Sequence, residues 1–362
     1  MRSFCCTRCG WNVHFENSSC LNCGSVLGFD PDAMSIMALE PAPGAPKPGA
    51  PETWTIAGDT DGTVARLCAN AAFDTCNWLC HANDPGTLCR SCALNRTIPD
   101  LSAPDQRAAW HSIEAAKKRL VYSLLRFGLP FAGTAPDEQP MAFDILRNAS
   151  TSHFDGVITI DVAEADDVER ERRRTFFQEP YRSLLGHFRH ESAHYFWPLL
   201  VERAGFIDEF RTLFGDERAD YTTALDRHHG NGPAADWQLS FVSAYASSHP
   251  WEDWAETWAH YFHIVETIDT AETEGIEPRA RGIIYGSAWP FKAYDVYRES
   301  SIDTLMQRWI PLTAALNELS RSMGHADFYP FVTPVNAYPR FAFVERVIRA
   351  AAAKSTETSS ES

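Results

Sequence analysis

Two histidines and a glutamate near the middle of the chain have the types and spacing of a metal-dependent hydrolase site. His190 and His194 are four residues apart, and Glu191 directly follows the first histidine. Residues four apart lie on one face of a helix, so the two imidazoles can bind one tetrahedral Zn²⁺. From the same turn, Glu191 can take a proton from a zinc-bound water and later protonate a leaving amine. The segment predicts a catalytic zinc site.

The residues around this motif favour a buried helix over a chance match. We expect a helix from Pro180 to about Arg203 with one apolar stripe. The stripe contains Leu184, Leu185, Phe188, Ala193, Phe196 and Trp197.

A catalytic zinc has three protein ligands and one open position, so two histidines leave the site incomplete. The extended HExxHxxGxxH motif is excluded, because Trp197 and Leu200 occupy its glycine and third-histidine positions. The best candidate source of the third ligand is a helix predicted over 252–266. In this segment Glu252 and Glu256 are four residues apart and lie among tryptophans. Buried carboxylates are costly unless paired or bound to metal. The alternative is that both glutamates are solvated helix charges.

The other histidines are weaker candidates, and the alternative for His187, three residues before His190, is that it binds the metal or supports a ligand. His187, His249 and His260 lie near the two candidate helices and are interpreted as packed side chains. His228 and His229 precede glycines, which favours a loop.

All ten cysteines lie between Cys5 and Cys92, which sets the first quarter of the chain apart. Two CxxC pairs can close one structural zinc site, which contributes folding energy and a docking surface but no chemistry. The predicted ligands of this site are Cys6, Cys9, Cys20 and Cys23. Cys5 is then an adjacent spare thiol.

A second group of cysteines has less regular spacing. Cys89 and Cys92 form one CxxC pair and need two partners among Cys68, Cys76 and Cys80. Spacing alone allows Cys76 with Cys80 as readily as other combinations. We expect a second structural zinc in this group.

Beyond Cys92, hydrophobic periodicity predicts long helices and two strands, which indicates an α+β fold dominated by helices. The predicted helices, besides the two above, span 106–127, 166 to about 174, and 303–322, and the strands span 141–146 and 156–162.

Composition divides the chain into five predicted parts. A Pro/Ala/Gly-rich run predicts a linker, and a polar, Ser-rich end predicts a disordered tail. The parts are a zinc ribbon (1–38), a Pro-rich linker (39–53), a second Cys-rich zinc-binding module (54–100), a large domain that contains the HExxH motif (101–350) and the tail (351–362).

Charge and hydropathy limit the partners. The net charge of −16 disfavours nucleic acid, which binds clustered Lys and Arg. We expect no secretory signal and no membrane span, because the chain has no suitable apolar stretch. These features predict a cytoplasmic protein, in which metal rather than disulfides explains the cysteines.

Two motifs taken together resemble a known family. His190-Glu191-Ser192-Ala193-His194 and Glu252-Asp253-Trp254-Ala255-Glu256 resemble the bacterial zinc-binding metallopeptidase family that has an N-terminal zinc-ribbon region. The Glu-x-x-Ala-Glu pattern is also similar to gluzincin peptidases of the anthrax lethal factor type. The similarity includes Cys76-Asn77-Trp78-Leu79 and Glu164-Ala165-Asp166-Asp167.

This resemblance implies a zincin-like domain in which His190, His194 and Glu252 bind the catalytic zinc. Glu256 would steady a ligand histidine, and Tyr245, seven residues before Glu252, would hydrogen-bond the developing oxyanion.

For the second cysteine group, the resemblance favours Cys68 and Cys76 as partners of the CxxC pair and leaves Cys80 free. It also implies that the strand before the HExxH helix borders the cleft and accepts an extended substrate. The segment 156–161 is a candidate for that strand, or an ordinary sheet strand.

The leading hypothesis is a zinc-dependent peptidase that cleaves protein or peptide substrates with a Glu-activated, zinc-bound water. It implies one catalytic and two structural zinc ions, and a protein partner for the zinc ribbon. The alternative is a non-enzymatic adaptor, in which the zincin-like domain is only a scaffold.

Overall fold

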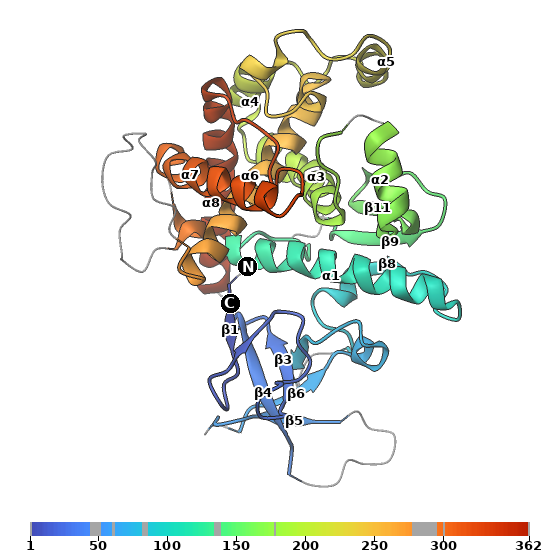
Figure 1. Cartoon of the computed structure of the whole chain (residues 1–362), viewed down its shortest axis with the longest axis vertical. Helices are drawn as coiled ribbons and strands as arrows, with labels where there is room; N and C mark the ends of the chain where they lie inside the picture. The colour runs from blue at the N-terminus through green and yellow to red at the C-terminus, as the bar shows by residue number, and fades with distance from the viewer. Residues whose placement is uncertain are drawn as a thin grey trace. The chain divides into compact units, whose positions relative to one another are not determined.

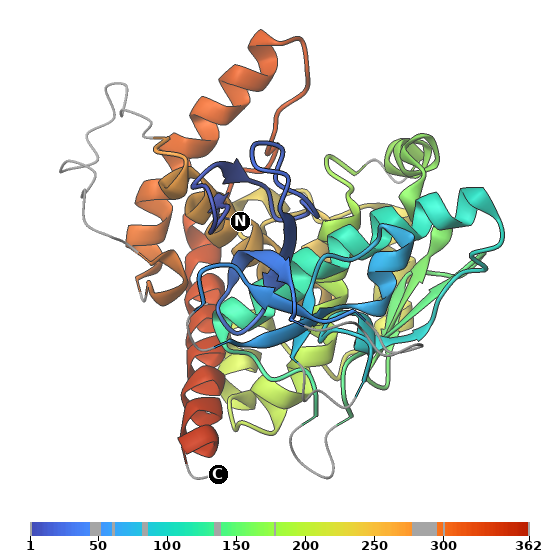
Figure 2. The ribbon, with the colours of Figure 1, turned by 90° about the horizontal axis from the view of Figure 1, so that it is seen from below.

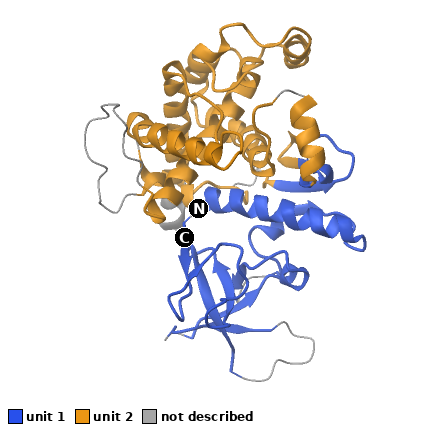
Figure 3. Ribbon diagram, viewed as in Figure 1, with its two compact units in different colours: residues 1–125, 142–150, 159–165 blue, residues 126–141, 151–158, 166–362 orange. Residues whose placement is uncertain are grey.

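The computed structural model describes residues 2–43, 52–59, 62–81, 86–133, 139–176, 179–276, 295–299 and 301–360, with side chains up to 354 in the last range. The chain divides into two compact units (Figure 3). Unit 1 contains residues 1–125, 142–150 and 159–165, and unit 2 contains residues 126–141, 151–158 and 166–362. Most of the predicted linker, residues 44–51, lies outside the described residues.

Unit 1 begins with a small hairpin and a five-stranded antiparallel sheet, in which neighbouring strands follow chain order. The hairpin is β1 (Phe4–Cys5) and β2 (Asn12–Val13); the sheet is β3 (Val26–Asp30), β4 (Ser35–Pro41), β5 (Trp54–Ile56), β6 (Val64–Leu67) and β7 (Leu79–His81). Leu39, Ala65 and Leu79 form a buried cluster on it.

The sheet corrects the predicted domain boundaries at residues 38 and 39. Residues 39–41 belong to β4, where Leu39 pairs with Ile56 and Pro41 with Trp54. Proline is tolerated at the end of a strand, so the Pro-rich composition did not exclude pairing there. The predicted ribbon and second module therefore share one sheet.

Helix α1 (Pro104–Phe127) confirms the predicted helix over 106–127. Ile113, Leu120 and Leu124 are fully buried on its inner face. The helix ends at Gly128, whose φ of +68° suits glycine better than any residue with a Cβ.

A second sheet has the strand order β10-β11-β9-β8. Its strands are β8 (Asn95–Thr97), β9 (Ala142–Leu146), β10 (Ser152–Phe154) and β11 (Val157–Asp161). The two predicted strands are confirmed as β9 and β11. Of the two alternatives for 156–161, the structure favours the ordinary sheet strand over the strand that borders a cleft, because β11 has a neighbour on each side. Within the described residues, β10 is the edge strand on that side, and it lies against helix α3 in unit 2.

Unit 2 is a helical assembly in which α6 contacts α3, α4, α7 and α8 (Figure 1). The helices are α2 (Asp167–Phe176), α3 (Leu184–Trp197), α4 (Ile207–Phe214), α5 (Tyr221–Asn231), α6 (Pro250–Thr273), α7 (Ile302–Ser322) and α8 (Tyr338–Ser360). Short helical turns are η1 (Ala69–Phe73), η2 (Cys92–Leu94), η3 (Val162–Ala165), η4 (Pro198–Glu202), η5 (Trp237–Leu239), η6 (Tyr245–Ser247), η7 (Val296–Arg298) and η8 (Val335–Ala337). The mixture of helix and sheet with helices dominating is as predicted.

Three details of unit 2 differ from the sequence predictions. Helix α3 begins at Leu184 rather than Pro180, because Ser183 caps it. His228 and His229 lie in helix α5, not in a loop. Helix α8 extends to Ser360 (Figure 2), so the predicted disordered tail from 351 is helical at least to that residue. The alanine run over 350–353 has the highest helix propensity and continues the helix into the polar end.

Among the described residues, none of the helices has the length and apolarity needed to cross a membrane.

Candidate active site and metal centres

Helix α3 places the HExxH motif on a buried framework. The Ser183 side chain accepts a hydrogen bond from the backbone N–H of Gly186 at 3.0 Å and so fixes the start of the helix. Phe188, Ala193 and Phe196 are fully buried. His190 and His194 keep side-chain exposures of 15% and 19%, so their face of the helix remains accessible.

Helix α6 supplies the facing carboxylates. Its N-terminus is capped by His249 and has Pro250 in its first turn, a residue well suited to that position. Two indoles join α6 to α3: Trp254 Nε1 donates to the carbonyl of Ala193 at 2.8 Å, and Trp258 Nε1 donates to Ser192 Oγ at 3.2 Å. Both indoles are fully buried, so these directional bonds fix which faces of the two helices meet.

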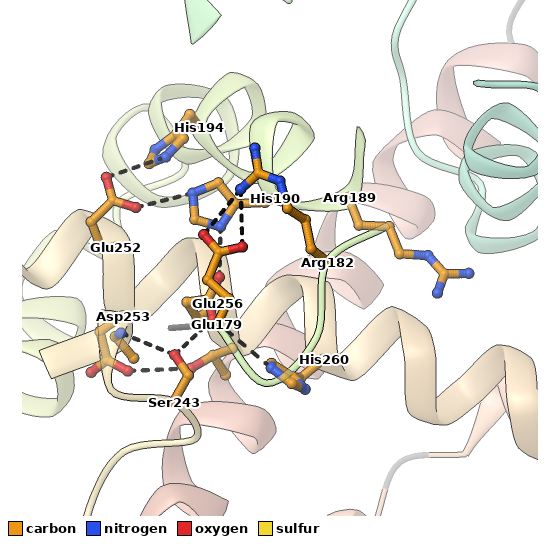
Figure 4. Close-up of polar contacts among 12 residues, drawn as sticks. Glu179, Arg182, Arg189, His190, His194, Ser243, Glu252, Asp253, Glu256 and His260 are labelled. Atoms are coloured by element: carbon orange, nitrogen blue, oxygen red, sulfur yellow. Dashed lines mark hydrogen bonds and ion pairs between the residues drawn. The ribbon is translucent and has the colours of Figure 1, made fainter. Parts of the chain in front are cut away.

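The predicted ligands converge between these helices (Figure 4). Glu252 is 1% exposed. Its Oε2 lies 3.0 Å from His190 Nε2, and its Oε1 lies 3.6 Å from His194 Nε2. One donor atom from each of the three residues lies within 4.8 Å of the others, as a shared metal ion requires. The alternative that Glu252 is a solvated helix charge is wrong.

The donor set fits zinc. His190 Nδ1 is hydrogen-bonded to Glu256 Oε1 at 2.8 Å, so Nε2 carries the lone pair of a neutral ring and faces Glu252 Oε2. Two acceptor atoms stay this close only when a proton or a metal ion lies between them. Glu252 Oε2 is also buried without a hydrogen-bond donor. A divalent cation satisfies all of these atoms, and two imidazoles with one carboxylate are a common catalytic zinc set.

The histidines and carboxylates of the site shift one another's pKa values. Burial favours neutral His190, but its contacts with Glu252 and Glu256 outweigh this and raise its pKa well above the usual value. Burial would likewise raise the pKa of Glu252, but the two histidines hold it well below the usual range. The carboxylates therefore stay ionised only with positive charge beside them.

Glu256 lies behind His190, as the resemblance implies. Its Oε1 accepts from His190, and its Oε2 accepts from Ser243 Oγ at 2.7 Å. His260 Nε2 lies 3.9 Å from the same oxygen, and its Nδ1 is hydrogen-bonded to the Tyr329 hydroxyl. His260 is therefore a buried neighbour of Glu256, not a metal ligand.

Tyr245 and Glu191 both adjoin the metal donors. The Tyr245 ring centroid lies 6.0 Å from that of His190, and burial followed by the charge of Glu252 raises the pKa of this phenol. The phenol stays protonated and able to donate a hydrogen bond. Glu191 is 7% exposed and directly follows His190.

Tyr221 is a site residue that sequence reasoning missed. It is the first residue of α5, and its hydroxyl donates to Glu252 Oε1 at 2.6 Å. The sequence feature that could have indicated helix α5 was Asp220, whose side chain accepts a hydrogen bond from the Thr223 N–H and caps the helix. An N-cap residue before this segment, with Gly232 after it, is typical of a helix rather than a loop.

The first cysteine tetrad consists of the four predicted ligands Cys6, Cys9, Cys20 and Cys23. Their sulfur atoms lie within 4.8 Å of one another. Cys6 and Cys23 are 3.7 Å apart, as are Cys9 and Cys20. Cys5 is outside this cluster and faces Asn12. The four thiols are those predicted for the first structural zinc.

The second tetrad contains Cys68, Cys76, Cys89 and Cys92. Backbone N–H groups point at its sulfurs: Cys89 N donates to Cys68 Sγ at 3.4 Å, and Cys92 N to Cys89 Sγ at 3.5 Å. Burial is the main cause that raises the pKa of Cys76 and of Cys89 well above the usual value, so a cation is needed to ionise these two thiols. Cys80 is outside the tetrad, 3.9 Å from the Thr87 carbonyl, in agreement with the resemblance.

A buried charge cluster on α1 adjoins the second tetrad and was not predicted. Glu114, Lys117 and Lys118 are 0%, 0% and 4% exposed. Lys117 Nζ lies 2.8 Å from Glu114 Oε1, and Cys92 Sγ lies 3.8 Å from Glu114 Oε2. Burial lowers the pKa of Lys118, but the nearby cysteine sulfurs and Glu114 together outweigh it and raise this pKa above the usual value.

Asp30, Asp32 and His81 form another group of possible donor atoms. Asp32 already pairs with His81 at 2.7 Å and with Arg90 at 2.5 Å, so its charge is satisfied by the protein.

Comparison with known proteins agrees with this geometry. Residues 106–347 match the family described as putative zinc-binding metallo-peptidases, and residues 3–103 match a zinc-ribbon domain. The chain belongs to this metallopeptidase family. Its relatives include an uncharacterized protein of Mycobacterium tuberculosis and one of Mycobacterium bovis, each 41% identical over 96% of this chain and 95% of the relative. No solved structure matches the chain.

The family matches confirm the predicted fold class, with an N-terminal zinc-ribbon region before a peptidase domain. The two cysteine tetrads and the family together support zinc binding. The compact units divide the chain differently, because most of α1 packs with unit 1.

Proposed function

We propose that this protein is a zinc-dependent peptidase. The observation that carries the proposal is the convergence of His190, His194 and Glu252 on one point, with Glu191 in the adjacent helical position. Family membership supports the reaction class. The same reasoning gives three zinc ions, one at this site and one in each cysteine tetrad.

A bound zinc ion would polarise the carbonyl of the bond to be cleaved and make a water molecule more acidic. Glu191 takes a proton from the attacking water and transfers it to the amine nitrogen as the C–N bond breaks. Tyr245 donates a hydrogen bond to the carbonyl oxygen as negative charge develops on it. Glu256 holds His190 with Nδ1–H engaged, which leaves Nε2 available as a donor atom.

The decisive experiment is Glu191→Gln in the full chain. Loss of the base lowers peptide hydrolysis by roughly 10²–10⁴-fold, while the zinc content stays at three per chain. Activity would be measured on a denatured protein substrate, and zinc by elemental analysis. Unchanged hydrolysis in Glu191→Gln would exclude this mechanism, and an empty His190–His194–Glu252 site in wild-type protein would exclude the proposed function.

We also propose that the protein works in the cytoplasm. Eight of the ten cysteines belong to the two tetrads, where their sulfurs lie within metal-binding distance of one another. An oxidising compartment would convert neighbouring thiols into disulfides and abolish both tetrads.

A further inference from the structure

The two oxygens of Glu252 have different surroundings. Oε1 accepts a hydrogen bond from the Tyr221 hydroxyl at 2.6 Å. Oε2 is buried, has no hydrogen-bond donor among the described residues and lies 3.0 Å from His190 Nε2. Oε2 is therefore the oxygen that can bind a metal ion without loss of the Tyr221 hydrogen bond.

Tyr221 is held in place by neighbours at the start of α6. Its ring lies 5.1 Å from the His249 ring and 6.0 Å from the Trp251 ring. His249 is 3% exposed; its Nδ1 accepts from the Trp251 N–H at 3.1 Å, and its Nε2 lies 3.1 Å from the carbonyl of Ala219. With Nδ1 as acceptor, Nε2 is the protonated nitrogen and donates to Ala219. His249 thus ties the residues before Tyr221 to the end of the helix that carries Glu252.

The rest of α5 contributes little to holding the phenol. Among the residues of α5, only Ala224 is buried, and Tyr221 itself is 36% exposed. The position of the hydroxyl is therefore set by the His249–Ala219 contact and by its own bond to Glu252.

We propose that Tyr221 is a positioning residue that restricts Glu252 to binding the metal through one oxygen, Oε2. The hydrogen bond to Oε1 disfavours a two-oxygen contact and so preserves the fourth coordination position, which catalysis needs for water. This inference rests on the proposed function, because it assumes a metal ion at His190, His194 and Glu252. It assigns a role to a phenol that does not itself touch the reacting atoms.

Removal of the hydroxyl tests this role. In Tyr221→Phe the ring keeps its contacts with His249 and Trp251, but Oε1 becomes free to bind the metal. We expect the site to retain its metal with an added oxygen contact, and kcat to fall by roughly 10–100-fold with little change in KM. A loss of packing alone would not change the number of metal contacts.

The metal itself is the probe. A brief chelator treatment empties the open site, and Co²⁺ is then added to the full-length protein until one Co²⁺ and two Zn²⁺ are present per chain. Four-coordinate Co²⁺ absorbs visible light more strongly than five-coordinate Co²⁺, so Tyr221→Phe should lose at least about half of the wild-type band. A crystal structure of the zinc form then gives the distances of both Glu252 oxygens to the ion.

Tyr297→Phe is a matched control. Its hydroxyl donates to Glu266 Oε1 at 2.5 Å, another buried carboxylate on α6 that is outside the metal cluster. This variant should keep the wild-type Co²⁺ spectrum. If Tyr221→Phe fails to fold, His249→Asn provides the second test, because Asn can still cap α6 but cannot reach Ala219. It should change the spectrum in the same direction.

The outcomes separate the two proposals. A wild-type Co²⁺ spectrum in Tyr221→Phe, or two Glu252 oxygens already bound in wild-type protein, would overturn the role of Tyr221 and leave the peptidase proposal intact. No metal at the His190–His194–Glu252 site in wild-type protein would overturn both.

Discussion

The second cysteine tetrad and the HExxH site gather metal donors in contrasting surroundings. The sulfurs belong to residues that are at most 7% exposed, and backbone N–H groups point at several of them. The HExxH site combines a buried carboxylate with two imidazoles that keep exposures of 15% and 19%. The first arrangement has no approach for a substrate, whereas the second has one accessible side. A zinc ion would supply the same charge to both sites, so under the proposed function the surrounding protein decides whether the ion stabilises the fold or supports a reaction.

The largest expected effect concerns the second cysteine tetrad, which is a closed centre because its sulfurs are buried. Cys68→Ser should remove one zinc ion per chain and lower the free energy of unfolding of unit 1, because metal binding and folding are coupled with energies on the order of 10 kcal/mol in small zinc modules. Cys80→Ser is the control and should keep all three metals, since its sulfur lies outside the tetrad. Elemental analysis and thermal unfolding measure both. Metal loss in Cys80→Ser but not in Cys68→Ser would reverse the assignment.

Removal of the metal also tests the difference between the HExxH site and the two cysteine tetrads. Brief treatment with 1,10-phenanthroline should remove one zinc ion and all peptidase activity while the circular dichroism spectrum is unchanged, because the exposed site exchanges first. Zn²⁺ added back should restore activity. Earlier release of zinc from the cysteine tetrads, detected with a thiol reagent, would contradict the distinction between open and closed centres.

Tyr245→Phe should lower kcat by about 10²–10³-fold, the usual effect of losing one donor to a developing oxyanion. Its zinc content should equal that of the wild type, because Tyr245 is not one of the three predicted metal ligands and its ring lies beside that of His190. Steady-state kinetics measure the change. A reduced zinc content with normal kcat per bound zinc would instead assign Tyr245 a structural role.

The smallest expected effect is at Glu256. Glu256→Gln keeps the shape of the side chain but removes the charge opposite His190 Nδ1, so zinc affinity or kcat should fall by roughly 10–100-fold. Ser243→Ala removes one hydrogen bond to the same carboxylate and should have a weaker effect, about 1 kcal/mol. Titration with a competing zinc chelator compares the two. A larger effect in Ser243→Ala would mean that Glu256 is held mainly by the hydroxyl.

The parts of the molecule governed by local periodicity were predictable from the sequence. The spacing of His190 and His194 predicted two imidazoles on one face of a helix, and the apolar stripe predicted α3 with an error of four residues at its start. The CxxC pairs predicted two tetrads, but spacing could not choose between Cys68 and Cys80. That choice depends on where β6 and β7 place each sulfur, which is a tertiary property.

Contacts between distant residues were not predictable. Tyr221 meets Glu252 across 31 sequence positions, and nothing in its local pattern indicates a carboxylate partner. Lys117 and Lys118 look like surface charges in the sequence, but both are buried with Glu114. The pairing of β4 with β5 across the Pro-rich run likewise depends on residues brought together by the whole sheet.

The two indole bonds between α6 and α3 have a further consequence. Trp254 and Trp258 anchor the helices through backbone and hydroxyl partners, and neither bond involves a ligand of the HExxH site. The distance between the imidazoles and the carboxylate is therefore set when the chain folds, before any ion arrives. In the proposed peptidase, zinc would leave and return without rebuilding the helices, and the fraction of active protein would follow the zinc supply rather than the yield of folding.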